Sequence, residues 1–247
     1  MAKTRIDKLL FERGLAPSRE RAQAYIMAGK VLVDEVPVTK PGTTVNPEAQ
    51  VRVKGQDQPF VGRGGLKLLA ALQRFEIPVQ GRICIDVGSS TGGFTDCLLQ
   101  AGAAYVFAVD SGSNQLVQSL RNHTQVRSLE QTNFRHAELG LLGTYVDIGV
   151  VDVSFISLEL ILEPLFQLLV RGGNAVVLVK PQFEAGRDQI EKGGVVTDPK
   201  VRQEVFTQIK AKAVSVGFQV LGEMDSPIEG KKKGNLEALL WLLKPAV

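Results

Sequence analysis

The stretch that decides the fold is Asp86-Val87-Gly88-Ser89-Ser90-Thr91-Gly92-Gly93-Phe94, which continues the apolar run Ile83-Cys84-Ile85. The run predicts a buried strand, and the small residues after it predict a loop that leads into a helix over 93–101. Glycines let a ligand approach such a loop closely. The loop lacks both the Gly-x-Gly-x-x-Gly spacing of dinucleotide-binding proteins and the Gly-Lys-Ser/Thr of a P-loop. It is either a plain tight turn or a site for another small ligand.

Outward from this stretch, apolar β-branched runs alternate with amphipathic ones. The pattern predicts buried strands over 83–87, 105–109, 148–153 and 175–179, with helices around 93–101, 114–120, 157–169 and 198–216. Such alternation is typical of an α/β, doubly wound, Rossmann-like sheet that is mostly parallel, with helices on both faces. Ligands bind these sheets at the carboxyl ends of the strands.

Polar side chains stand at several of those strand ends. Asp110 is placed to accept both ribose hydroxyls of an adenosine, whereas Asn133 either meets the adenine edge or is a turn residue. Asp152 and Lys180 close the next two strands and can pair across the crevice. A lysine withdrawn from water can lose its charge and serve as a base, although most lysines are simply solvated.

The first quarter of the chain differs in charge from the rest. Residues 1–60 hold ten basic and seven acidic side chains, so the whole excess of +3 lies there. Seven of the basic residues fall between Lys3 and Lys30. They are either ordinary solvated helix faces or the surface of a polyanion-binding module.

Local signals divide this leading segment into short elements. Thr4 and Asp7 resemble a capping box for a first helix, Ser18 can cap a second, and 30–33 and 44–53 are predicted to be extended. Pro37 indicates an edge strand. A polar linker over 55–59 then separates a small α+β domain, residues 1–58, from a larger domain, residues 59–247, whose first residues 59–62 form the junction.

Length and composition narrow the class of protein. A chain of 247 residues with 44% hydrophobic side chains suits one α/β domain with a small appendage. No signal-peptide core or membrane-length apolar run is present, so we expect a cytoplasmic protein without membrane partners. Cys84 and Cys97 fit the core of a protein in a reducing compartment, and His123 and His136 lack the companions of a metal site.

The leading segment resembles the S4 RNA-binding domain. The resemblance rests on Arg5-Ile6-Asp7-Lys8-Leu9-Leu10, on 14–19, and on the run from Ala22 to Val33. It implies recognition of the backbone and shape of structured RNA rather than of base edges. The residues to which it assigns RNA contacts are Arg5, Lys8, Arg19, Arg21 and Lys30.

The larger domain resembles the S-adenosylmethionine-dependent methyltransferases, because 86–93 has the form Asp-x-Gly-x-x-x-Gly-Gly of their motif I. Lys67, Asp152, Lys180 and Glu237 resemble in order and context the catalytic Lys-Asp-Lys-Glu tetrad of the FtsJ-like ribose 2'-O-methyltransferases. With the S4 domain, the whole chain resembles the TlyA family, often labelled haemolysins. The implied cofactor is S-adenosyl-L-methionine, held by Asp86, Gly88, Ser89, Gly92, Gly93, Phe94, Asp110, Asn133 and Asp152.

The same resemblance implies a ribosomal RNA substrate, favouring a cytidine ribose. Arg63 and the run Lys231, Lys232 and Lys233 are further RNA-binding candidates, although such a run is more often a solvated loop. Two departures from the family stand out. The segment after Asp110 is Ser111-Gly112-Ser113-Asn114, which leaves its cofactor contacts open, and Gly62 replaces a common Ser, a change expected to touch only the linker junction.

Three other functions fit parts of the sequence. A noncatalytic RNA-binding protein with a methyltransferase shell would not need the tetrad, and a secreted haemolysin or cytolysin would need an export signal. A small-molecule methyltransferase would leave the S4 domain without a use. The sequence predicts neither the oligomeric state nor the ribosomal subunit that is modified.

Overall fold

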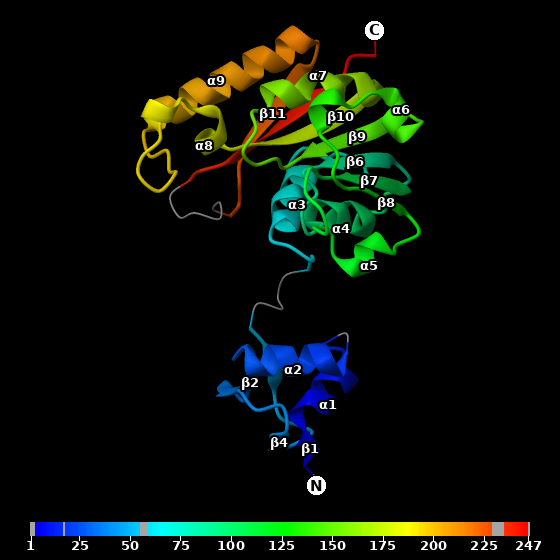
Figure 1. The fold of residues 1–247 in the computed structure, drawn as a ribbon, viewed down its shortest axis with the longest axis vertical. Coiled ribbons are helices and arrows are strands. Elements are labelled where there is room, and N and C mark those ends of the chain that lie inside the picture. Colours follow the sequence, from blue (N-terminus) through cyan, green and yellow to red (C-terminus); the bar gives the residue numbers. More distant parts are fainter. Residues whose placement is uncertain (1–2, 17, 55–58, 229–234, 247) are drawn as a thin grey trace. The chain divides into compact units, whose positions relative to one another are not determined.

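The computed structural model describes residues 3–16, 18–54, 59–228 and 235–246. The chain divides into two compact units, Met1–Pro59 and Phe60–Val247 (Figure 1).

The N-terminal unit packs two helices against short strands. Its elements are β1 (Thr4–Arg5), α1 (Ile6–Glu12), α2 (Arg19–Met27), β2 (Val31–Val33), β3 (Val36–Val38), β4 (Thr44–Val45) and β5 (Val51–Val53). The strands form a sheet of order β3-β2-β5 and the pair β1-β4, both antiparallel. Ile6, Leu10 and Ile26 are fully buried where the helices meet the strands, which gives the unit a core of its own.

Two of the local predictions for this unit are confirmed and one is wrong. The Ser18 side chain accepts a hydrogen bond from the Arg21 N–H at 3.2 Å and caps α2, and Pro37 lies in the edge strand β3. The capping box of Thr4 and Asp7 does not form. Thr4 lies in β1, and Arg5 is the N-cap residue of α1 but its side chain makes no capping bond. The Asp7 carboxylate is buried and accepts hydrogen bonds from other donors.

The C-terminal unit is built on a seven-stranded sheet of order β11-β12-β10-β9-β6-β7-β8. The strands are β6 (Ile83–Val87), β7 (Tyr105–Val109), β8 (Val126–Leu129), β9 (Val146–Val151), β10 (Leu169–Val179), β11 (Gln219–Asp225) and β12 (Ala238–Leu243). β6 to β10 run parallel to one another, and β12 runs antiparallel to both β10 and β11. The doubly wound, mostly parallel sheet is therefore confirmed.

Helices cover both faces of this sheet (Figure 1). They are α3 (Gly64–Arg74), α4 (Gly93–Gln100), α5 (Gln118–Arg121), α6 (Leu139–Leu142), α7 (Glu159–Leu168), α8 (Pro181–Glu184) and α9 (Pro199–Val216), with 3-10 turns at Phe134–His136 and Arg187–Gln189. Alternate strand residues point to opposite faces. Cys84 accordingly packs with α3 and α4, whereas Ile85 packs with α7 and α9. Two apolar layers thus hold the strand ends rigidly.

The sequence pattern failed where elements lack an apolar run. The helix expected over 114–120 is only the short α5. The backbone N–H groups of residues 114–116 bond to the Glu130 carboxylate instead of to backbone carbonyl oxygens. β11 alternates between exposed and half-buried residues at the sheet edge, which is why no buried strand was predicted there.

Candidate active site

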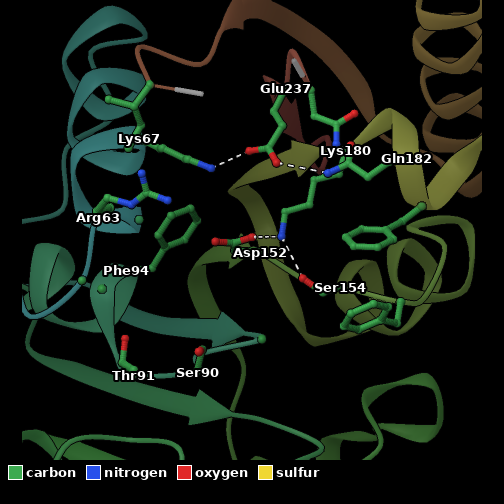
Figure 2. A pocket seen from close by; sticks show the side chains of 18 of the residues that line it. Arg63, Lys67, Ser90, Thr91, Phe94, Asp152, Ser154, Lys180, Gln182 and Glu237 are labelled. Carbon is green, nitrogen blue, oxygen red and sulfur yellow. Dashed lines mark hydrogen bonds and ion pairs between the residues drawn. The ribbon is translucent and has the colours of Figure 1, made fainter. Parts of the chain in front are cut away.

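The sheet changes winding direction at β6, which has β7 on one side and β9 on the other. A crevice opens at such a point beyond the carboxyl ends of the strands. Here it is a cavity of about 720 Å³. Its lining includes charged, small and aromatic side chains from six segments far apart in the sequence, among them Lys67, Gly88, Ser89, Gly93, Phe94, Asp152, Phe155, Lys180, Gln182 and Glu237 (Figure 2).

Lys180 and Asp152 form an ion pair inside this cavity. The Lys180 Nζ lies 2.5 Å from Asp152 Oδ1 and donates to the Val153 carbonyl at 3.0 Å and to the Ser154 Oγ at 3.1 Å. The lysine and aspartate side chains are 11% and 24% exposed. Because an ammonium has three hydrogens, all three acceptors together fix Lys180 in one position. Of these acceptors, the exposed Ser154 hydroxyl is the one a ligand can reach most directly.

A second ion pair lies across the same cavity. Lys67, on the first turn of α3, places its Nζ 2.5 Å from Glu237 Oε2, and both residues are buried. The Gln182 Nε2 donates to the other oxygen of Glu237 at 3.3 Å. Figure 2 shows this chain of contacts facing the Lys180 pair. Separating a buried ion pair would leave each charge uncompensated away from water. Lys67 and Glu237 therefore keep each other in place.

The loop after β6 has the backbone that its glycines predicted. Gly88 has a φ of +83°, and a Cβ there would lie 2.6 Å from the Asp152 carbonyl oxygen. Gly92 has a φ of +102°, and a Cβ there would meet the Leu120 side chain at 2.3 Å. Any other residue would therefore push the loop away from Asp152 or from α5. Gly93 and Phe94 start α4 at the cavity wall.

Asp86 lies beneath this loop and is fully buried. Its Oδ2 accepts a hydrogen bond from the Thr95 Oγ1 at 2.6 Å, whereas its Oδ1 has no hydrogen-bond partner among the described residues. Burial raises the pKa of Asp86 to about 7; the Thr95 bond opposes the rise, and the nearby Asp152 charge adds to it. A cation nearby would stabilise the ionised form of a carboxyl group that is buried in this way.

Asp110 joins the loop after β6 to the loop after β7. Its two oxygens accept hydrogen bonds from the N–H groups of Ser90 and Gly112, both at 2.8 Å. Glu130 in turn holds residues 114–116 and receives the Arg121 guanidinium at 3.0 Å. The segment whose cofactor contacts the sequence left open is thus organised by Glu130, which no sequence signal had singled out.

The start of α3 presses against the start of α4. A Cβ on Gly93 would lie 3.1 Å from the Gly62 carbonyl oxygen, and a Cβ on Gly62 would lie 3.0 Å from the Thr91 Oγ1. Gly62 therefore lines the cavity, and the expectation that it touches only the linker junction is wrong. Its neighbour Arg63 is exposed and also lines the cavity (Figure 2).

Other predicted residues lie away from the cavity lining. The Asn133 Oδ1 accepts hydrogen bonds from the backbone N–H and the Nε of Arg135, so the side chain caps the turn Phe134–His136. This is the turn role that the sequence had left open beside an adenine contact. Lys231, Lys232 and Lys233 lie outside the described residues.

The sequence missed Phe155, the most exposed large apolar side chain of those described, with 91% of its surface accessible. Its φ of +65° is unusual for a bulky residue. The ring lies 5.0 Å from that of Phe183, which in turn lies 5.8 Å from the Lys180 Nζ. The only signal in the sequence was an aromatic residue three positions after Asp152, in a loop rather than a strand.

In the N-terminal unit, one buried carboxylate organises the basic face. Asp7 accepts hydrogen bonds from Arg5, Arg19 and Gln23, and the pKa of Asp7 is held well below its usual range, chiefly by the Arg5 bonds. Both arginines remain about half exposed. Lys8, Arg21 and Lys30 are exposed as well. Asp7 thus fixes the Arg5 and Arg19 guanidinium groups in place while leaving them open to solvent.

Within the described ranges, no group of three His, Cys, Asp or Glu side chains could hold a metal ion. No described helix is both long enough and apolar enough to cross a bilayer.

Comparison with known proteins identifies both units. Residues 60–243 match the FtsJ-like methyltransferases and residues 4–51 match the S4 domain. The "Putative rRNA methyltransferase YqxC" of Bacillus subtilis (strain 168) is 47% identical over 244 residues, which span 98% of this chain and 86% of the relative. The "16S/23S rRNA (cytidine-2'-O)-methyltransferase TlyA" of Mycobacterium tuberculosis (strain ATCC 25618 / H37Rv) is 44% identical over 241 residues, or 97% and 90% of the two chains.

A solved structure titled "Putative hemolysin from Streptococcus thermophilus" is 46% identical and aligns with a TM-score of 0.76, covering 99% of this chain and 90% of the other. The family match over most of the chain and the similarity along nearly all of it agree with the sheet order. The chain therefore belongs to the FtsJ-like methyltransferase family and, with its own S4 domain, to the TlyA group.

Proposed function

We propose that this protein transfers a methyl group from S-adenosyl-L-methionine to a ribose 2'-oxygen of ribosomal RNA, with a cytidine as the target. The observation that carries the proposal is that two ion pairs, Lys180 with Asp152 and Lys67 with Glu237, face one cavity beside the glycine loop. The relatives named as rRNA methyltransferases support the RNA substrate, and the name of the M. tuberculosis protein supports the cytidine.

The residues around the glycine loop fit S-adenosyl-L-methionine. The unpaired Oδ1 of the buried Asp86 suits a ligand with an ammonium group, and Asp110 at the end of β7 is placed for ribose hydroxyls. Gly88, Ser89, Gly93 and Phe94 line the cavity next to them, together with Asp152. When bound, the cofactor supplies a methyl group already activated by a sulfonium.

The chain's own residues then have two tasks, positioning and proton removal. We assign Lys180, after its ammonium has released a proton to solvent, to take the proton of the 2'-hydroxyl as a neutral amine. Asp152 orients Lys180 and stabilises the ammonium that forms again. Because Ser154 is the exposed partner of Lys180, the 2'-hydroxyl is expected to displace the Ser154 hydroxyl there. Lys67 and Glu237 hold the ribose and its phosphate. Positioning supplies about 7–11 kcal/mol and a general base about 10² to 10⁴ in rate, so positioning dominates.

The exposed ring of Phe155 at the cavity suits the nucleobase of the acceptor nucleotide. An enzyme that modifies a nucleotide takes it out of its stack, and the exposed ring is a surface on which a base can stack. Phe155 lines the same cavity as Lys180 and rests on Phe183. Arg63 at the cavity rim and Arg5, Lys8, Arg19, Arg21 and Lys30 of the S4 unit are assigned to RNA phosphates.

Methyl transfer from tritiated S-adenosyl-L-methionine to separated ribosomal subunits tests this function. After nuclease digestion, mass spectrometry of the nucleosides should find 2'-O-methylcytidine in a subunit from a strain that lacks the gene. Methylation of a base atom, or no transfer to either subunit or to their free rRNA, would contradict the proposal. The noncatalytic alternative predicts RNA binding without any transfer.

A further inference from the structure

The segment between β9 and α7, residues 152–158, connects a catalytic candidate to the acceptor side of the cavity. It begins with Asp152 and carries Phe155 at its apex. A φ of +65° at a phenylalanine costs free energy and persists only where the surroundings hold it. The bonds on either side of Phe155 show what holds it.

Two sets of hydrogen bonds fasten this segment, one on each side of Phe155. On one side, the Lys180 Nζ donates to the Val153 carbonyl and to Ser154. On the other, the Glu184 carboxylate accepts hydrogen bonds from the Ser157 Oγ at 2.6 Å and from the Leu158 N–H at 2.9 Å. Both holding side chains come from one short stretch, the end of β10 and the helix α8.

Glu184 performs a task that other helices of this chain perform locally. α2 and α9 are capped by Ser18 and Asp198, the residues that precede them. In α7 the N-cap residue is Leu158, whose side chain cannot cap, and the Ser157 Oγ one position earlier accepts a hydrogen bond from the Glu159 N–H at 3.2 Å. The Leu158 N–H bonds to Glu184, 26 positions along the chain. Partial burial raises the pKa of Glu184, which is the cost of keeping a carboxylate there. Because Ser157 already supplies a local acceptor to the first turn of α7, the bonds of Glu184 to Ser157 and Leu158 chiefly fasten the segment that precedes the helix.

We propose that Glu184 and Ser157 form a clasp that positions Phe155 for the acceptor nucleotide, so that Glu184 is a positioning residue for methyl transfer. The proposal rests on the proposed function and deepens its acceptor side. The donor side of the cavity, formed by the loop after β6, makes no contact with the clasp among the bonds described. Loss of the clasp should therefore affect RNA methylation and leave cofactor binding unchanged.

The test compares Glu184→Ala, Ser157→Ala and Phe155→Ala with a matched control, Glu163→Gln, which alters an exposed acid on the same helix α7. Cofactor affinity is measured by calorimetry, and the rate is measured in a single turnover at saturating ribosomal subunits. Stacking on Phe155 is expected to be worth roughly 10- to 100-fold in rate. Glu184→Ala should lose at most that factor, with a cofactor Kd within twofold of wild type, and Glu184→Gln, which keeps an acceptor oxygen, should lose less.

The decisive comparison is the double variant of Phe155→Ala and Glu184→Ala. If Glu184 acts through Phe155, the double variant is no slower than Phe155→Ala alone. Multiplied losses, an unchanged rate in both Glu184→Ala and Ser157→Ala, or an equal loss of cofactor affinity would overturn the clasp. Ser157→Ala removes one of the two Glu184 bonds, together with the bond from the Glu159 N–H, and keeps the bond between Leu158 and Glu184. It tests the same point should Glu184→Ala fail to fold. A wild-type protein that transfers no methyl group refutes the proposed function itself, and the clasp's role with it.

Discussion

Asp86 is the residue whose environment is most at odds with its chemistry. It is completely buried, one of its oxygens lacks a partner among the described residues, and its pKa is raised from 3.8 to about 7. A site that binds a cation explains why such a carboxylate is kept, because the bound charge compensates what burial costs.

Replacing Asp86 by Asn should therefore stabilise the empty protein and weaken the donor complex. When the pKa of an acid is higher in the folded than in the unfolded protein, its contribution to folding stability is complete below the unfolded pKa, near 4. That contribution is lost as the pH rises through the folded pKa, which is about 7 for Asp86. Three pKa units correspond to about 4 kcal/mol at most. Without the donor, Asp86→Asn should raise Tm by several °C at pH 8 and by little at pH 4.5. The expectation fails if the variant melts at or below the wild-type temperature at pH 8.

At the same scale, the sequence identified most of the charged site but not its neighbours. Asp152 and Lys180 could be named because each follows an apolar strand. Gln182, Ser154 and Phe155 could not, because their roles depend on a loop conformation and on contacts between segments that no periodicity encodes.

The loop after β7 shows how an element can be ordered by one side chain. Glu130 gathers the N–H groups of residues 114–116 and the Arg121 guanidinium, and these backbone bonds lower its pKa. The loop begins at Asp110, the candidate for the cofactor's ribose. On the proposed function, the order of this loop is a condition for binding the adenosine half of the donor.

Glu130→Ala should release this loop and raise the Kd for S-adenosyl-L-methionine roughly tenfold, about the cost of one lost hydrogen bond to a charged group. Isothermal titration without RNA measures the effect. Glu138→Ala, at an exposed acid nearby, is the control. An unchanged Kd in Glu130→Ala would mean that the loop is irrelevant to the donor.

Elements with a continuous apolar run were predictable from the sequence, and elements at edges were not. β6, β7 and α4 lie where the pattern placed them. α5 is shorter than predicted and β11 was missed, because Glu130 competes for backbone groups in the first and solvent exposure removes the apolar signal in the second.

At the scale of the whole molecule, the proposed function assigns RNA binding to the S4 unit and methyl transfer to the larger unit. In the S4 unit, Asp7 fixes Arg5 and Arg19, whereas Arg21 and Lys30 are exposed and make no bond to Asp7. Arg21 and Lys30 can therefore be changed without disturbing that buried carboxylate.

Changing Arg21 and Lys30 together to Gln should weaken binding to rRNA and leave the donor Kd unchanged. Each phosphate contact contributes about 0.7 to 0.9 to the slope of log affinity against log salt. The slope should fall by about 1.4 to 1.8 if both residues contact phosphates. The control is Arg171→Gln, which changes an exposed arginine near the amino-terminal end of β10. Equal slopes for variant and wild type would remove both residues from the RNA surface.

The central claim is that Lys180, held by Asp152, acts directly on the ribose hydroxyl. The most direct measurement is the single-turnover rate of Lys180→Ala on ribosomal subunits, with donor affinity measured on the same preparation and Lys200→Ala, an exposed lysine on α9, as the control. The account predicts a donor Kd within about threefold of wild type and a rate lower by about 10² to 10⁴. A Lys180→Ala protein that methylates rRNA within a few-fold of the wild-type rate would contradict it.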